Sequence, residues 1–262
     1  MSRLVRVELL KIRTTRLTYG LLATGAGLTI LFSILEASRA GAGKSVGPLN
    51  TASGLNAVIT GGTFALLMAA VLGATVSSGE FRHCTATLTY LATPQRSRVL
   101  AAKTGAAALI GAGFGLVGYV IALGVGLIFV SAHGYQVAVG DATLVRYGAG
   151  HVVAAALLAA IGVALGSLIR SQLAVVIGVF VWTIVIESIL GGLFNSVQPY
   201  LPYTAATTLA GSQLGGAAFG PAHDATSAAT PLPFAAAAAL LAGVAVVIAA
   251  VAARTRVARD VS

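Results

Sequence analysis

An uncharged, apolar run between Thr104 and Ser131 sets the class of this chain, and it reads TGAAALIGAGFGLVGYVIALGVGLIFVS. About 20 such residues in a helix cross the roughly 30 Å of hydrocarbon in a bilayer. Five further runs have the same character. The predicted spans cover residues 17–35, 56–76, 104–131, 148–169, 172–194 and 232–253. We therefore expect an all-α fold, a polytopic membrane protein with six transmembrane helices.

The composition agrees with this class. Hydrophobic residues make up 57% of the 262 residues and charged residues only 9%, whereas an ordinary soluble domain has about 25% charged residues. The net charge of +9 raises the question of nucleic-acid binding. However, the cations are spread over separate short segments and do not form one patch. The composition therefore excludes an ordinary soluble domain, and we expect no nucleic-acid partner.

The distribution of the cations predicts the orientation of the chain. Thirteen of the 16 lysines and arginines lie before the first span, between spans two and three, between spans four and five, or after the sixth. The other gaps hold only Arg39, Lys44 and Arg146. Cytoplasmic loops of polytopic membrane proteins carry such an excess, so both termini are predicted to be cytoplasmic. The same cations favour contact with anionic membrane lipid, at about 1 kcal/mol for each cation near the surface.

The spans divide a single predicted domain, residues 1–262, into loops of unequal size. Residues 1–16 form a cytoplasmic segment that leads into a full-length span, which indicates a retained span and not a cleaved signal peptide. Residues 78–103 form the large cytoplasmic loop, and residues 195–231 form the longest external loop. Within the latter, Thr204–Phe219 is apolar but too short to span. It is either a short re-entrant or interfacial helix, or an ordered external loop.

Glycine pairs at helical spacing are candidates for close helix packing. Gly111 and Gly115 share one face of the third span, and Gly162 and Gly166 share one face of the fourth. Small residues four apart let helix backbones approach closely. Such pairs also arise by chance in helices rich in alanine and glycine.

No pattern in the sequence predicts catalysis or a metal site. The seven acids and four histidines are scattered, and the single cysteine, Cys84, excludes an internal disulfide and a thiolate cluster. The run Gly41–Ser45, GAGKS, looks like a phosphate-binding loop. However, Ser38 stands where that motif needs its first glycine, and Pro48 follows. We therefore expect no catalytic residue, no metal and no cofactor bound by this chain.

Glu187 is the one acid within a predicted span. A carboxylate in hydrocarbon is costly, so such residues usually face a protein interior or a water-filled cavity. Glu187 is therefore a candidate for the substrate path or for gating. The alternative is a helix-end residue bonded to backbone groups of the following loop, such as those around Pro199–Tyr203.

The 78–103 loop mixes charge with aromatic and aliphatic groups, and it reads SGEFRHCTATLTYLATPQRSRVLAAK. A short helix is predicted over Glu80–Leu91, and Pro94 would end it. Its apolar residues Phe81, Leu88 and Leu91 among polar ones suit docking against a soluble partner. The alternative is a helix that lies on the membrane surface.

This loop resembles the cytoplasmic loop of the membrane subunits of type-2 ATP-binding-cassette (ABC) transporters, although His83-Cys84 stands where a small residue is more usual. Val7–Arg16, VELLKIRTTR, resembles the segment before their first span. Glu187 followed by Leu201–Ala205, LPYTA, resembles a pattern of their bacterial members. The six-span layout matches along nearly the whole chain.

The resemblance implies a permease subunit of an ATP-driven exporter in the bacterial cytoplasmic membrane. A separate ATPase subunit would bind ATP and Mg, and a second permease, the same chain or a different one, would complete the path. The 78–103 loop would act as a coupling helix set into the ATPase. The residues implied at that boundary are Glu80, Phe81, Arg82, Thr85, Leu91, Pro94 and Arg96.

Two other function classes stay open as alternatives. An ion-coupled secondary transporter would have paired interrupted helices and carboxylates near the middle of the membrane. A polytopic membrane enzyme would have acids, histidines or serines clustered at one depth. The substrate is not predicted by any of these patterns.

Overall fold

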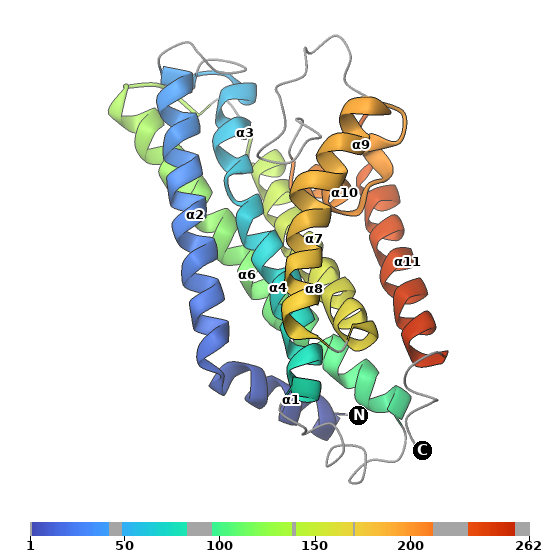
Figure 1. The fold of residues 1–262 in the computed structure, drawn as a ribbon. Coiled ribbons are helices and arrows are strands. Elements are labelled where there is room, and N and C mark those ends of the chain that lie inside the picture. The colour runs from blue at the N-terminus through green and yellow to red at the C-terminus, as the bar shows by residue number, and fades with distance from the viewer. Residues whose placement is uncertain are drawn as a thin grey trace.

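A computed structural model of the chain describes residues 2–41, 49–82, 96–137, 140–169, 171–211 and 230–254. The described part contains helices and no strand, which confirms the all-α class (Figure 1). Six helical stretches within it are long and apolar enough to cross a membrane, as predicted. They cover Arg16–Ala40, Ala52–Glu80, Arg98–Ala132, Asp141–Leu168, Gln172–Leu193 and Phe234–Ala252. The side of the membrane that each end faces stays a prediction.

Helix α1 (Ser2–Thr14) lies across one end of the bundle, and we call this the basic end (Figure 1). Its buried and half-buried residues Val5, Leu9 and Ile12 recur at helical spacing, and α1 packs against α6 (Arg96–Ala132). The helix stops at Thr15, whose hydroxyl donates to the carbonyl oxygen of Lys11 at 2.7 Å. Helix α2 (Arg16–Gly41) then begins the first span. Gly41, the first residue of the GAGKS run, is the last residue of α2, and residues 42–45 lie outside the described residues.

The second span consists of α3 (Ala52–Thr60) and α4 (Thr63–Arg82), separated by Gly61-Gly62. A glycine pair is a common cause of a helix kink, and here both glycines are needed for space. A Cβ on Gly61 would lie 2.3 Å from the Ser33 hydroxyl oxygen, and a Cβ on Gly62 would lie 2.8 Å from Nε2 of His151. The sequence predicted a short helix over Glu80–Leu91. Residues 80–82 instead belong to the last turn of α4, and residues 83–91 lie outside the described residues.

The centre of the bundle is formed by α4, α6 and α7 (Asp141–Leu168), and α4 is almost wholly buried. Carbonyl oxygens of one helix face glycines of the next. A Cβ on Gly111 would lie 2.8 Å from the oxygen of Ala155, and one on Gly115 would lie 2.2 Å from that of His151. The corresponding distances are 2.1 Å from Gly162 to Ala70 and 2.3 Å from Gly166 to Ala74. All four glycines therefore lie at close helix contacts.

The fifth span is made of three pieces: α8 (Gln172–Phe180), the π-helical segment η1 (Val181–Ile186) and α9 (Glu187–Leu193). A 3₁₀ turn, η2 (Gln198–Tyr200), leads into α10 (Pro202–Leu209), and α11 (Phe234–Ala252) forms the sixth span. Helix α10 packs on α7 and α11 at the end opposite the basic end (Figure 1). It supplies a short buried helix in the Thr204–Phe219 segment, of which residues 212–219 lie outside the described part.

Candidate functional site

Four charged side chains meet at the basic end, where α1, α4 and α6 come together. Glu80, in the last turn of α4, accepts a hydrogen bond from Nζ of Lys11 on α1 at 2.7 Å through Oε1. Its other oxygen, Oε2, forms an ion pair with Nζ of Lys103 on α6. Lys11 also donates to Oε1 of Glu8 at 3.3 Å. We call these four residues the charge cluster.

The members of the charge cluster differ in exposure. The side chain of Lys103 is 5% exposed and that of Glu80 is 12% exposed, whereas that of Lys11 is 47% exposed. An ammonium buried without an acid would be strongly destabilising, so Glu80 is what allows Lys103 to lie inside. Burial lowers the pKa of Lys11, but the hydrogen bond and charge of Glu80, together with Glu8, raise the pKa of Lys11 above its usual value overall.

The sequence named Glu80 as a candidate but did not predict its partners. One signal was present: Glu8 falls on the same face of α1 as Val5, Leu9 and Ile12. A charged side chain on a buried face is retained only with a partner, and Lys11 stands one turn away on the same helix. The pairing of Lys11 with Glu80, 69 residues apart, has no such signal.

The other residues implied at an ATPase boundary lie at the end of α4, at the start of α6, or outside the described residues. Phe81 and Arg82 complete the last turn of α4, and Arg96 begins α6. The side chains of these three residues are not described. Thr85, Leu91 and Pro94 lie outside the described residues. The carboxylate of Glu80 thus joins α4 to α6, the two helices at the ends of the 78–103 loop.

Glu187 is the second candidate, and only 3% of it is exposed. Its Oε1 accepts hydrogen bonds from the backbone N–H of Tyr203 and from Nε1 of Trp182, both at 2.9 Å. Its Oε2 accepts from the backbone N–H of Thr204 at 2.9 Å and from the hydroxyl of Thr204 at 3.1 Å. A side chain of the fifth span therefore holds the first turn of α10.

The sequence of α10 explains why it needs a carboxylate from elsewhere. Leu201 at its N-cap has no side chain that can accept a hydrogen bond, and Pro202 has no N–H. The N–H groups of Tyr203 and Thr204 are buried and have no acceptor within the helix. This geometry is the bonded helix-end alternative that the sequence left open. A role of Glu187 in a substrate path stays a prediction.

The π-helical segment η1 brings Trp182 to Glu187. Residues five apart are separated by about 140° around an α-helix, but the i→i+5 pattern of a π-helix brings them close to one face. The N–H of Glu187 donates to the carbonyl oxygen of Trp182 in that pattern. Nothing in the sequence indicated this segment, because a π-turn depends on packing and has no residue signature comparable to a cap or a proline.

Three further contacts fix α10 against α4, α3 and α7. The hydroxyl of Tyr203 donates to the carbonyl oxygen of Thr63 at 3.0 Å, and Nδ2 of Asn56 donates to that of Gly211 at 2.7 Å. A Cβ on Gly150 of α7 would lie 1.8 Å from the oxygen of Leu209, so only glycine permits this approach. Helix α10 is therefore held at both ends.

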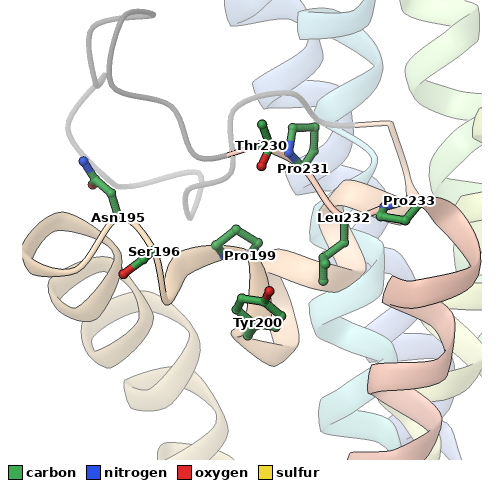
Figure 2. A pocket seen from close by; sticks show the side chains of 8 residues that line it. All are labelled: Asn195, Ser196, Pro199, Tyr200, Thr230, Pro231, Leu232 and Pro233. Carbon is green, nitrogen blue, oxygen red and sulfur yellow. The ribbon is translucent and has the colours of Figure 1, made fainter.

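A pocket of about 450 Å³ opens beside α10, as Figure 2 shows. Its lining comes from the turns before α10 and α11: Asn195, Ser196, Pro199, Tyr200, Thr230, Pro231, Leu232 and Pro233. None of these residues is charged, and Glu187 is not among them. Within the described ranges, no group of three or more histidines, cysteines or acids is placed to hold a metal ion.

Comparison with protein-family models and with curated proteins gave no match to this sequence. The type-2 ABC family therefore stays a proposal. The observations relevant to that proposal are the contacts of the charge cluster and the hydrogen bonds between Glu187 and α10.

Proposed function

We propose that this chain is the permease subunit of an ATP-driven exporter of the type-2 ABC class, in a bacterial cytoplasmic membrane. One observation carries the proposal: segments that resemble this class separately in sequence are joined to one another in space. Val7–Arg16 contacts the start of the 78–103 loop through Lys11 and Glu80. The end of that loop contacts the same carboxylate through Lys103. The third resembling pair, Glu187 and the LPYTA segment, is joined by hydrogen bonds.

In this proposal the basic end faces the cytoplasm, and a separate ATPase binds ATP and Mg. The ATPase contacts the 78–103 loop through Thr85, Leu91, Pro94 and their neighbours. When the ATPase pair closes, it moves the loop. Because Glu80 ties α4 to α1 and α6, the three helices move as one body. The permease then changes between two discrete arrangements, a rigid-body mechanism.

The opposite end of the bundle would face the outside, where α10 is inserted among α4, α7 and α11. Glu187 then acts as a gating residue by holding the first turn of α10 in place. A second permease, an identical or a different chain, completes the path. The fifth and sixth spans expose apolar side chains, among them Ile177, Ile189 and Val246, and such a neighbour would pack there.

The test is a pull-down of the tagged chain from its native membrane in mild detergent, with identification of co-purifying proteins and an ATPase assay. A soluble ATPase should co-purify. A variant with Thr85→Ala, Leu91→Ala and Arg96→Ala should lose that ATPase while it still inserts into the membrane. The matched control carries Val145→Ala and Arg146→Ala at the opposite end of the bundle and should retain the ATPase.

Three results would contradict the proposal. A chain that purifies alone under several gentle conditions would favour a secondary transporter or a membrane enzyme. An ATPase that stays bound to the loop variant, with normal transport, would remove the coupling role of the 78–103 loop. Transport that stops on collapse of ion gradients but survives removal of ATP would favour a secondary transporter.

A further inference from the structure

The π-helical segment η1 has no cause in its own sequence. Its six residues, Val181–Ile186, include neither glycine nor proline, the residues that most often interrupt a helix. π-Helical turns are rare, and they occur mostly as single turns within α-helices, frequently at functional sites. A contact made outside η1 must therefore keep this turn wider than an α-helix.

The contacts that depend on the wide turn converge on one carboxylate. Trp182 reaches Oε1 of Glu187 at 2.9 Å because the turn brings residues five apart together. The same oxygen accepts the N–H of Tyr203 at 2.9 Å, and Oε2 accepts both donors of Thr204. Three of the four donors to this carboxylate thus belong to α10. The width of η1 and the docking of α10 therefore depend on the same two oxygen atoms.

An α-helical η1 would turn a different residue toward α10. The hydrogen bonds of an α-helix join residues four apart and those of a π-helix join residues five apart, so the π-turn holds one extra residue. If residues 181–186 became α-helical, the chain after them would rotate by about 100° relative to α8, the angle of one residue. Ile186 would then take the direction in which Glu187 now points. Since Glu187 is buried and Ile186 is half-buried, an apolar side chain would replace the carboxylate on the buried side.

Helix α9 is the part of the fifth span that such a change would rotate. Helix α8 packs on α4, and its residues Val175 and Val179 are buried. Within the described chain, α9 lies mainly against η1 and η2, its neighbours along the chain. The buried residues of α9 are Glu187 and Gly191. The hydrogen bonds of Glu187 are therefore the main contacts that hold α9 in its present rotation.

We propose that η1 is a two-state element whose register is set by the docking of α10. While α10 is docked, its donors bind Glu187 and η1 stays π-helical. When the first turn of α10 leaves, the buried carboxylate keeps only Trp182 as a partner, which is costly. Residues 181–186 then become α-helical, α9 rotates by about 100°, and Ile186 replaces Glu187 on the buried side. The inference needs neither an ATPase nor transport, so its failure would leave the proposed function untouched.

The test measures which residues of α9 face lipid. Ile177→Cys, Ser188→Cys and Ile189→Cys are made one at a time in a Cys84→Ser chain, which has no other cysteine, and each is labelled with a nitroxide. Electron paramagnetic resonance gives the collision rate of each nitroxide with oxygen dissolved in the bilayer. Nanodiscs that hold one copy of the chain ensure that exposed faces meet lipid. Ile177 on α8 is the control for correct insertion, because its direction does not change.

The order of the collision rates at residues 188 and 189 reports the register. Ile189 is 53% exposed and Ser188 is half-buried, so the rate should be higher at Ile189 when η1 is π-helical. Glu187→Leu removes the acceptor for α10 and should reverse this order, because each residue of α9 then takes the direction of the next one. Thr204→Pro leaves Oε2 without its two donors and should also reverse the order; proline is tolerated in the first turn of a helix.

Deletion of Ile186 is the matched control. It removes the extra residue of η1, so the span can be α-helical while Glu187 keeps its direction. In the deletion chain, Glu187→Leu should leave the higher rate at Ile189, and a reversal there would contradict the proposal. An unchanged order in both Glu187→Leu and Thr204→Pro would overturn it. Reversal in Glu187→Leu but not in Thr204→Pro would overturn the role of α10, because the carboxylate would then set the register by itself.

Discussion

The charge cluster predicts a specific order of stability among single substitutions. Glu80→Gln removes the carboxylate shared by two ammonium groups and leaves Lys103, whose side chain is 5% exposed, without an acid. Breaking a buried pair in this way costs about 3–5 kcal/mol. Lys103→Met leaves Glu80 paired with Lys11, so we expect only about 1–2 kcal/mol. Lys11→Gln acts on a half-exposed side chain, where solvent screens the pair, and should cost less than about 1 kcal/mol.

The double variant is the sharper test of this reasoning. In Glu80→Gln with Lys103→Met, no buried ammonium remains, and the methionine keeps a comparable apolar volume. Replacing a buried ion pair by neutral groups is often close to neutral. We therefore expect the double variant to be more stable than Glu80→Gln alone, even though it removes one more charged group.

Thermal unfolding in detergent, followed by circular dichroism of the helices, measures the order. At roughly 2–4 °C for each kcal/mol in a chain of this size, Glu80→Gln should lower Tm by about 10 °C and Lys11→Gln by about 3 °C or less. Arg39→Gln, which opens an exposed pair with Glu36, is the control for loss of a surface cation and should match Lys11→Gln. A double variant less stable than Glu80→Gln, or equal losses for Glu80→Gln and Lys11→Gln, would refute the reasoning.

Three other outcomes can be checked in the same assay. Glu187→Ala leaves three buried donors of α10 without an acceptor and should cost about 3–5 kcal/mol. Ser188→Ala, whose hydroxyl donates to the carbonyl oxygen of Ile184 one turn earlier in the same span, should lower Tm by no more than about 3 °C. Similar losses for the two variants would contradict the anchoring role of Glu187. Gly150→Ala places a Cβ 1.8 Å from a backbone oxygen and should cost about 1–3 kcal/mol, but Gly178→Ala, with open space around it, should be neutral or stabilising. Because the pKa of Lys11 is raised in the folded protein, the contribution of Lys11 to stability is fully present below its ordinary pKa of about 10.4 and is lost as the pH rises through the folded value. The Tm difference between wild type and Lys11→Gln should therefore be constant between about pH 7 and pH 9 and shrink above about pH 10.5. A Tm difference that grows with pH would contradict this reasoning.

The number of spans was predictable because hydrophobic length is a local property of the sequence. The ends of the spans were less so. The third span was predicted to begin at Thr104, but α6 begins at Arg96, because a helix continues past the hydrocarbon wherever its polar turns find partners, as Lys103 does. The second span was predicted to end at Val76, but its helix α4 likewise continues to Arg82.

The contacts of the candidate sites were not predictable from local patterns. The sequence marked Glu187 as unusual and offered two interpretations, but the choice depended on where residues 203 and 204 fold back. Glu80 was singled out for its place in a resembling segment, whereas its structural partners come from other helices. The spacing of Gly111 and Gly115 pointed to a helix contact, but which helix they meet follows only from the arrangement of the bundle.

Helix α4 connects the two candidate sites physically. Its last turn carries Glu80, and the carbonyl oxygen of its first residue, Thr63, accepts the hydrogen bond from Tyr203 of α10. The 20 residues of α4 span about 30 Å, and almost all of them are packed on neighbouring helices. A packed helix transmits a displacement and does not absorb it by bending. A movement imposed on the 78–103 loop would therefore either reach α10 or be taken up at the kink at Gly61-Gly62, and the hydrogen bond from Tyr203 lies on the α4 side of that kink.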